Sequence, residues 1–461
     1  MNTRVLSHPN ELKRQIGLPT AIALVVGEVV AVGIFLTPAG MAKSLGSPFW
    51  LLVVWLSMGL MALCGALCYG ELAARFPEAG GGYVYLREAY GPAVAFLYGW
   101  MAFLVMDPGI TAALAVGMAG YAAYSLALSP WALKGFAIAA IMLVAALNIR
   151  GVKFGGWLVR WLTIVKLGLL LFILLWSFAL RLGDWEHFTP FIAQRDGSTP
   201  LLGALAGGLV AAFFSFGGWW DVSKLAGEVR NPARTLPKAL AYGVLTVTLV
   251  YVLTSAVFIY LVPLESVASS EAFAAQAGEV LFGRVGGQVF SGVVIIAVFG
   301  ALAGIIMSAP RVYFAMARDE VFLPAAASVH PRYGTPARAI TLQALLASML
   351  VIIGNFEQII SYFIFVVVIF LALTVASIFV LRRARPVAGG YVTPGYPVTP
   401  FIFLLLIVPL LLLLGVNQPA HSFLGVAVVA LGLPFYYLVF RRGAAQQGRN
   451  YTNDLDQDHS I

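Results

Sequence analysis

The chain has 461 residues, of which 61% are hydrophobic and 10% are charged, and its formal net charge is +8. Soluble domains carry about 25% charged residues, so this composition excludes an ordinary soluble protein and predicts an all-α integral membrane protein. Apolar stretches recur along nearly the whole chain, each near the length of about 20 residues that a membrane-spanning helix needs. We predict twelve spans, at 17–40, 49–70, 94–126, 133–148, 157–180, 201–227, 239–261, 289–309, 339–353, 359–381, 400–415 and 423–440.

These spans divide the chain into a cytoplasmic N-terminal segment (1–16), one twelve-span transporter domain (17–440) and a disordered cytoplasmic tail (441–461). Lysine and arginine are concentrated in alternate loops. The outward segments contain only Lys43, Lys134, Arg181, Arg195 and Arg284, and Lys166 is the one cation expected inside the membrane. The positive-inside rule then predicts a multi-pass protein of the plasma membrane with both termini in the cytoplasm. Anionic lipid headgroups account for the positive charge, so no nucleic-acid partner is expected.

Two of the predicted spans contain interruptions. Ala31-Val32-Gly33 breaks the first span and Gly217-Gly218 breaks the sixth. Glycine costs a helix interior about 1 kcal/mol relative to alanine, and backbone groups freed inside a bilayer need new partners. Broken helices at matching positions of two chain halves indicate the binding site of a secondary transporter. Spans 1–5 and 6–10 would then form a five-helix inverted repeat, with spans 11 and 12 added.

The chemistry of a broken helix suggests the kind of solute. The N–H groups that begin the second half carry partial positive charge and suit a carboxylate. The carbonyl groups that end the first half suit an ammonium group or a sodium ion. Two such breaks side by side therefore predict a small zwitterionic solute, such as an α-amino acid.

Other classes of protein lack support in the sequence. The five histidines are scattered, and no phosphate-binding GxxxxGK run is present, so we expect no enzyme activity, metal site or cofactor. Cys64 and Cys68, one helical turn apart, are predicted to be packing residues. A channel or a non-transporting amino acid sensor are the alternatives to a transporter. The histidines are His8, His187, His330, His421 and His459.

Four motifs carry a resemblance to a known family. They are the run 69–86 followed by Tyr90-Gly91-Pro92, the run 227–239, Gly33-Ile34-Phe35, and the run 214–219. In these positions the chain resembles the amino acid–polyamine–organocation permeases, and most closely their L-type amino acid transporter branch. The resemblance implies a LeuT-like permease of amino acids that works by alternating access, with sodium-independent exchange or proton-coupled uptake. Nothing in the sequence identifies an accessory subunit.

The resemblance also implies a substrate site around the breaks. The amides of Ala31, Val32 and Gly33 would hold the substrate carboxylate, and Gly217 would open the sixth span. Alternatively, the first span is only kinked at these residues. The family usually has Gly-Ser-Gly where this chain has Ala-Val-Gly, so a hydroxyl is lost and Val32, being β-branched, disfavours unusual backbone angles. The ammonium group would meet the carbonyls of Val29, Phe214 and Ser215, and Phe214 would also be the aromatic gate.

Four ionisable residues near the breaks are candidates for coupling. In the family a lysine at the position of Lys166 reaches span 1 and replaces a sodium ion; alternatively, Lys166 snorkels to the membrane edge. Glu28, Asp107 and Asp221 stand where small or amide residues are expected. They could attract a cationic amino acid or a polyamine, one of them could carry a proton, or they could line a wet vestibule.

The predicted cytoplasmic side carries a further group of charges. Glu71 and Arg75 close span 2, and together with Glu228 and Arg230 they could form ion pairs that hold this side shut; alternatively, they are inert surface charges. The aromatic residues beside the breaks are Phe35, Phe216, Trp219 and Trp220, and Phe35 and Trp220 are expected to serve packing or interface roles.

Overall fold

The computed structural model describes residues 12–125, 128–263, 278–354, 356–385, 390–417 and 419–440. The predicted disordered tail (441–461) lies outside these residues, as does most of the N-terminal segment. The described residues form helices and connecting loops, and their one β-type pairing is an isolated bridge between Ile16 and Val229. The all-α prediction is therefore confirmed for the part of the chain that is described.

The helices follow the apolar stretches of the sequence. In chain order the α-helices are α1 (Leu18–Val29), α2 (Gly33–Leu45), α3 (Pro48–Arg75), α4 (Gly82–Tyr90), α5 (Pro92–Met101), α6 (Asp107–Ser125), α7 (Pro130–Ile149), α8 (Val152–Ala179), α9 (Leu201–Phe216), α10 (Pro232–Leu261), α12 (Gly286–Ser308), α13 (Pro310–Arg318), α14 (Ala337–Ile353), α15 (Phe356–Ala384), α16 (Val398–Asn417), α17 (Pro419–Ala430) and α18 (Gly432–Phe435). Short 3₁₀ or π segments are η1 (Ala102–Met106), η2 (Trp185–Phe188), η3 (Asp221–Glu228), η5 (Gly283–Val285), η6 (Pro324–Ala327) and η7 (Tyr436–Phe440).

Ten helical stretches in the described residues are long and apolar enough to cross a membrane, so the chain is a multi-pass membrane protein. Two shorter apolar helices, α1 and α14, fall in the predicted first and ninth spans. Each predicted span contains a described helix, but the number of crossings and the inverted repeat remain predictions. Helix α4 was not predicted.

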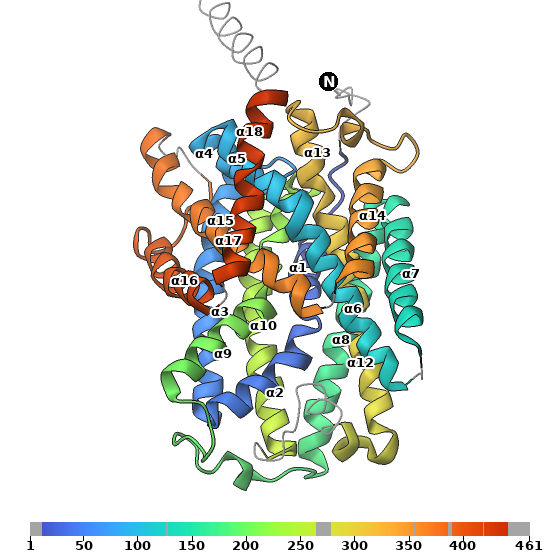
Figure 1. Cartoon of the computed structure of the whole chain (residues 1–461), viewed down its shortest axis with the longest axis vertical. Coiled ribbons are helices and arrows are strands. Elements are labelled where there is room, and N and C mark those ends of the chain that lie inside the picture. Colours follow the sequence, from blue (N-terminus) through green and yellow to red (C-terminus); the bar gives the residue numbers. More distant parts are fainter. Residues whose placement is uncertain are drawn as a thin grey trace, which may run out of the picture.

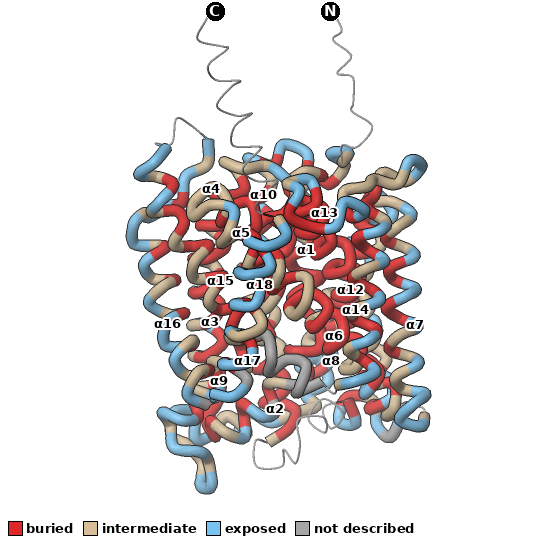
Figure 2. The backbone as a smooth tube through the Cα atoms, turned by 45° about the horizontal axis from the view of Figure 1, so that its top comes forward, coloured by how far each residue is buried: buried red, intermediate tan, exposed pale blue. Residues whose placement is uncertain are grey.

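The helix α8 shows how the bundle meets the bilayer. Trp157, Trp161 and Leu175 are exposed on one side of the helix, whereas Thr163 and Lys166 are buried on the other. Apolar residues that face lipid and polar residues that face the bundle interior are the arrangement expected of a membrane helix. Buried backbone runs through the middle of the molecule, and exposed residues mark outer helices such as α7 and α16 (Figure 2).

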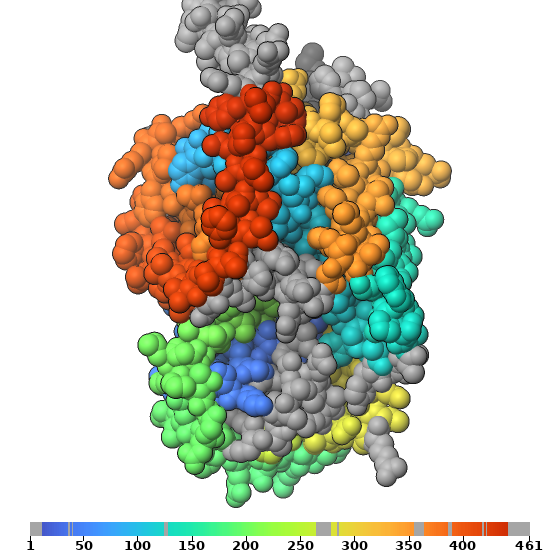
Figure 3. Space-filling view, in the orientation of Figure 1, coloured from blue at the N-terminus to red at the C-terminus, as the bar shows by residue number. Residues whose placement is uncertain are grey.

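The interrupted helices lie in the middle of the bundle. Helix α1 packs against α8, α10 and α12, α2 packs against α9, and α3 runs along α10 (Figure 1). Helices α17 and α18 form a column on the outer surface beside α5 (Figure 3). The first described residues and η7 lie at the same end of the bundle as α4 and α13 (Figure 1). The placement of both termini in the cytoplasm remains a prediction.

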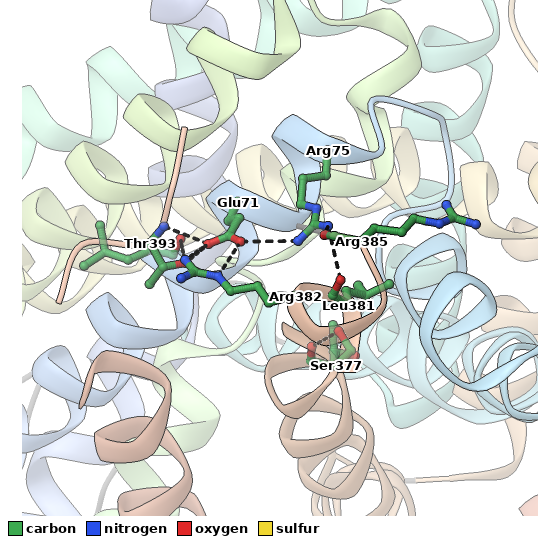
Figure 4. A network of polar contacts seen from close by, with 9 residues as sticks. Glu71, Arg75, Ser377, Leu381, Arg382, Arg385 and Thr393 are labelled. Atoms are coloured by element: carbon green, nitrogen blue, oxygen red, sulfur yellow. Dashed lines mark hydrogen bonds and ion pairs between the residues drawn. The ribbon is translucent and has the colours of Figure 1, made fainter. Parts of the chain in front are cut away.

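At that end, Glu71 ties α3 to α15 and to the segment before α16 (Figure 4). Its buried carboxylate accepts hydrogen bonds from Arg382 Nε at 2.9 Å and Nη2 at 2.6 Å, and from the amide and hydroxyl of Thr393, both at 2.7 Å. Arg75 lies 3.6 Å from Glu71 and donates to the carbonyls of Leu381 and Arg385. The predicted Glu71–Arg75 contact is therefore present, with Arg382 as the closer partner.

Glu228 has a different partner from the one expected. Arg311 of α13 donates to both carboxylate oxygens of Glu228, at 2.8 and 3.0 Å, and both side chains are buried. Arg230 contributes its main-chain amide to Ile16 instead of an ion pair with this group. The expectation that Glu228 pairs within the group of Glu71, Arg75 and Arg230 is wrong, because α13 passes closer to the end of η3.

We expect Glu71→Ala to lower the free energy of unfolding by about 3 kcal/mol, because Arg382 and the Thr393 amide lose their buried acceptor. The measurement is the thermal or denaturant midpoint of the detergent-purified protein. Glu78→Ala is the control, since the side chain of Glu78 is 59% exposed in its pair with Arg87 and should contribute about 0–1 kcal/mol. Equal midpoints for the two variants would contradict this role of Glu71.

Candidate functional site

Both predicted helix breaks are present. Helix α1 ends at Val29, residues 30–32 are not helical, and α2 begins at Gly33. Helix α9 ends at Phe216, and a turn over residues 217–220 leads into η3. Gly218 in this turn has φ +103°, a conformation that favours glycine. The sequence therefore placed both interruptions correctly.

The two breaks lie against each other. A Cβ atom added to Gly33 would stand 2.8 Å from Ser215 Cα, so only glycine allows α2 to approach α9 this closely. The hydroxyl groups of Thr37 and Ser215 are 2.8 Å apart and link the two helices further. Thr37 also lies within hydrogen-bonding distance of the Gly33 carbonyl, at 2.9 Å. The approach of the two breaks thus depends on the absence of a side chain at position 33.

One cavity collects the predicted substrate residues. Its lining includes Glu28 and Asp221 together with Val29, Ala31, Val32, Gly33, Phe214, Ser215 and Gly217. Most of the remaining wall is apolar and comes from α6, α12 and α15, with Ile110, Leu114, Ile305 and Val367 among its residues. Lys166 and Asp107 are not in the lining. The structure brings the predicted substrate residues together, and their roles remain predictions.

The start of α2 offers unused hydrogen-bond donors. The Phe35 amide donates to the Val32 carbonyl at 3.1 Å. Among the described residues, no main-chain acceptor is bonded to the amides of Ala31, Val32 and Gly33. Val32 has φ −58° and ψ −31°, ordinary helical angles, so the β-branched side chain does not distort the backbone here. These donors and the partial positive charge of a helix N-terminus suit an anionic group.

Lys166 stabilises the other side of the same break. Its ammonium group is fully buried and donates to the carbonyls of Gly27 at 2.8 Å, Val30 at 2.6 Å and Ala297 of α12 at 3.2 Å. Lys166 therefore reaches span 1, as the resemblance implies, and does not snorkel to the membrane edge. Its coupling role stays a prediction.

Tyr251 of α10 connects the two breaks, and the sequence analysis did not find it. Its hydroxyl oxygen lies 2.7 Å from both the Val29 carbonyl and the Ser215 carbonyl. A phenol has one hydrogen, so it donates to one of these carbonyls at a time. The carbonyls of Val29 and Ser215 thus already share one donor supplied by the protein, and their role toward a substrate ammonium group remains a prediction.

A cluster of buried charges lies next to the cavity. Lys224 of η3 places its ammonium group 2.8 Å from Asp107 and 2.7 Å from Asp221, and all three side chains are at most 1% exposed. Tyr313 of α13 donates to the second oxygen of Asp107 at 3.1 Å. The prediction that Lys166 is the one cation inside the membrane is wrong, because Lys224 lies within the candidate span Leu201–Glu228.

The missed residues differ in how visible they are in the sequence. Lys224 could have been found, since it is a charged residue within the predicted span 201–227. Tyr251 gives no such signal, because a tyrosine in an apolar stretch is equally compatible with packing. The packing expectation fits Phe35, which meets Phe290 edge-on at 5.7 Å, and it fits buried Cys64 and Cys68. Trp220, for which a packing or interface role was also expected, in addition lines the cavity.

The helical bundle, with two broken helices meeting at a central cavity, has the architecture of a membrane transporter. The sequence agrees: the family model described as amino acid permease matches residues 16–440, so the chain belongs to the amino acid permease family. The resemblance to amino acid–polyamine–organocation permeases of the L-type branch is confirmed.

Curated relatives cover most of the chain. The serine/threonine exchanger SteT of Bacillus subtilis (strain 168) is 32% identical over 95% of this chain and 99% of its own length. The large neutral amino acids transporter small subunit 2 of Homo sapiens is 28% identical over 93% of this chain and 80% of its own length. The b(0,+)-type amino acid transporter 1 of Mus musculus is 27% identical over 96% and 92%, respectively.

We expect Gly33→Ala to reduce substrate binding and to destabilise the protein by about 1–3 kcal/mol, because the new methyl group overlaps the Ser215 backbone. Binding to the purified protein and its melting midpoint are the measurements. Gly40→Ala is the matched control in the same helix, since a Cβ atom there meets nothing within 4 Å. If both variants behave like the wild type, the close approach of the breaks is not required.

Tyr251→Phe tests the link between the breaks. Loss of the hydroxyl leaves two buried carbonyls without their shared donor, and we expect stability to fall by about 1–3 kcal/mol. Tyr242→Phe is the control on the same helix, because Tyr242 is 54% exposed and its loss should leave the unfolding midpoint unchanged. An unchanged midpoint in Tyr251→Phe would show that the carbonyls find another donor.

Proposed function

We propose that this chain is a sodium-independent secondary transporter of amino acids that works by alternating access. The observation that carries the proposal is the meeting of two helix breaks at one cavity, with unused amides at the start of α2. Such a site binds the carboxylate of a small zwitterion on a helix N-terminus. Membership of the amino acid permease family supports the same class of solute.

The proposed inverted repeat has further support from the third span of each half. In the first half, the stretch Pro92–Ala123 contains the π-helical segment η1 just before Asp107-Pro108. In the second half, α12 ends at Ser308, and Pro310 begins α13. Proline lacks an amide hydrogen and disturbs the preceding turn, which explains both irregularities. Matching irregularities in spans 3 and 8, in addition to spans 1 and 6, favour a repeat of five spans.

Sodium independence follows from the position of Lys166. Its ammonium group already occupies the carbonyls of Gly27 and Val30 at the end of α1. Two like charges about 4 Å apart repel by roughly 4 kcal/mol at an effective dielectric constant of 20. A sodium ion bound at these carbonyls would have to displace Lys166 or meet this repulsion.

The mode of coupling is proposed as exchange. One of the relatives is named as a serine/threonine exchanger, and others are named as transporters of amino acids. Proton-coupled uptake is the second candidate, because the carboxylates of Glu28 and Asp221 line the cavity and could accept a proton. The protein is proposed to lie in the plasma membrane, with both termini on the cytoplasmic side.

Counterflow in proteoliposomes tests the proposal. Vesicles loaded with an unlabelled amino acid should accumulate the same labelled amino acid transiently, with empty vesicles as the control. A channel would equilibrate the label without overshoot, and a sensor would bind it without flux. Acidic outside medium without internal amino acid separates proton-coupled uptake from exchange. Absence of counterflow with every common amino acid would contradict the proposed function.

Lys166→Ala should lower exchange by about tenfold, which corresponds to 1.4 kcal/mol, because three buried carbonyls lose their donor and the broken helix loses its fixed charge. Wild-type exchange should be the same in sodium and in choline. The control is Lys153→Ala, at an exposed position of the same helix. A sodium requirement in the wild type would contradict the role proposed for Lys166.

A further inference from the structure

The cavity contains two carboxylates, of which, within the described part of the chain, Glu28 lacks a donor at both oxygens and Asp221 lacks one at a single oxygen. Among the described residues, neither oxygen of Glu28 has a hydrogen-bond partner, whereas Asp221 has the Lys224 ammonium group 2.7 Å from Oδ1 and no partner at Oδ2. Glu28 is 7% exposed and Asp221 is 1% exposed, and both residues line the cavity. Burying a carboxylate without donors is costly, and the cost is avoided only when a cation or a proton joins it. Two such groups in one cavity therefore indicate a ligand.

The two carboxylates pack against glycine residues, where no side chain keeps them at a distance. A Cβ atom on Gly304 of α12 would lie 2.4 Å from Glu28 Cγ and 2.9 Å from its Oε1, so the Glu28 side chain rests directly on the α12 backbone. A Cβ atom on Gly218 would lie 3.5 Å from Glu28 Cβ and 3.9 Å from Asp221 Oδ2. Glu28 and Asp221 therefore both lie close to Gly218.

The charges around this pair do not balance. Lys224 is shared between Asp107 and Asp221, so one ammonium group serves two carboxylates. Lys166 donates to the carbonyls of Gly27 and Val30, on either side of Glu28 in the chain. The three carboxylates Glu28, Asp107 and Asp221 thus face two ammonium groups, which leaves one negative charge. A single cationic group in the cavity would neutralise the cluster.

The carbonyls of Val29 and Ser215 are the competing acceptors for an ammonium group in this cavity. The carbonyls of Val29 and Ser215 share the hydroxyl of Tyr251, at 2.7 Å each. Ionised carboxylates make stronger hydrogen bonds to ammonium groups than neutral carbonyls do. Both oxygens of Glu28 and Oδ2 of Asp221 are therefore the better acceptors in this cavity.

We propose that Glu28 and Asp221 form a binding site for a primary ammonium group of the substrate. This inference rests on the proposed function, whose cavity it specifies further. The ammonium group has two possible sources in an amino acid, the α-amino group and the end of a basic side chain such as that of lysine. In both cases the ligand donates to Glu28 and Asp221 while Lys224 holds the remaining oxygen of Asp221.

The experiment measures ligand binding to the purified full chain by calorimetry at one pH. The ligands are lysine, norleucine, hexanoate and cadaverine. Norleucine is lysine without its terminal ammonium group, hexanoate lacks both ammonium groups, and cadaverine lacks the carboxylate. The variants are Glu28→Gln and Asp221→Asn, and Glu78→Gln is the control carboxylate, with a side chain 59% exposed at the end of the bundle. Gel filtration and melting curves report whether each variant is folded.

We expect each cavity variant to weaken binding of ammonium-bearing ligands at least about tenfold, and the control to bind like the wild type. If the side-chain ammonium group occupies the site, lysine binds more tightly than norleucine, and the variants remove that difference. If the α-ammonium group occupies it, norleucine binds more tightly than hexanoate, and the variants weaken lysine and norleucine alike. Loss of cadaverine binding in both variants supports the site even if no amino acid is exchanged.

Two results would overturn the inference. One is wild-type affinity of both folded variants for lysine, norleucine and cadaverine, in which case the carboxylates hold a proton or serve the structure. The other needs no variant: equal affinity of the wild type for lysine, norleucine and hexanoate shows that no ammonium group is recognised. Either result leaves counterflow of amino acids intact, so failure of this site is distinct from failure of the proposed function.

Discussion

The structure of the site depends on how the backbone groups freed by the break in α1 are satisfied within an apolar bundle. Helices that stop inside a bilayer expose carbonyls and amides that water cannot reach, and each unsatisfied group costs several kcal/mol. The carbonyl side of the break is satisfied by side chains from neighbouring helices: Lys166 of α8 and Tyr251 of α10. In the part of the chain that the structure describes, the amides of the break have no such partner. This asymmetry leaves a donor-rich end open to a ligand.

The same donors connect different helices of the bundle. Lys166 bonds α1 and α12 at once, and Tyr251 bonds α1 and α9. A change in the position of either break must therefore break or exchange hydrogen bonds that are buried, which favours discrete conformations over continuous movement. At the end that holds α4 and α13, Glu71 and Glu228 add ion pairs with Arg382 and Arg311. Opening of that end would require these buried pairs to separate.

The sequence predicted those features that have a local cause. Gly217-Gly218 and Gly33 weaken helices by their lack of side chains, so both breaks were visible without a structure. Lys166 was visible because a cation in an apolar stretch is costly and therefore informative. The contacts of Tyr251 and the pairing of Glu228 with Arg311 depend on residues far apart in the chain, and no local pattern predicts them. Lys224 is a different case, since its charge was visible within the predicted span 201–227 and was nevertheless missed.

The position of Glu28 bears on what the cavity holds. It is the penultimate residue of α1, where the helix carries partial negative charge, and a carboxylate there is disfavoured by about 0.3–1 kcal/mol even on a surface. Burial without a donor increases that cost, and the close contact with Gly304 leaves the side chain little room to move away. Asp221, by contrast, begins η3, where negative charge is tolerated, and it has Lys224 beside it. Glu28 is thus the group most in need of a positive partner, and the space in front of it is the cavity where the substrate is proposed to bind.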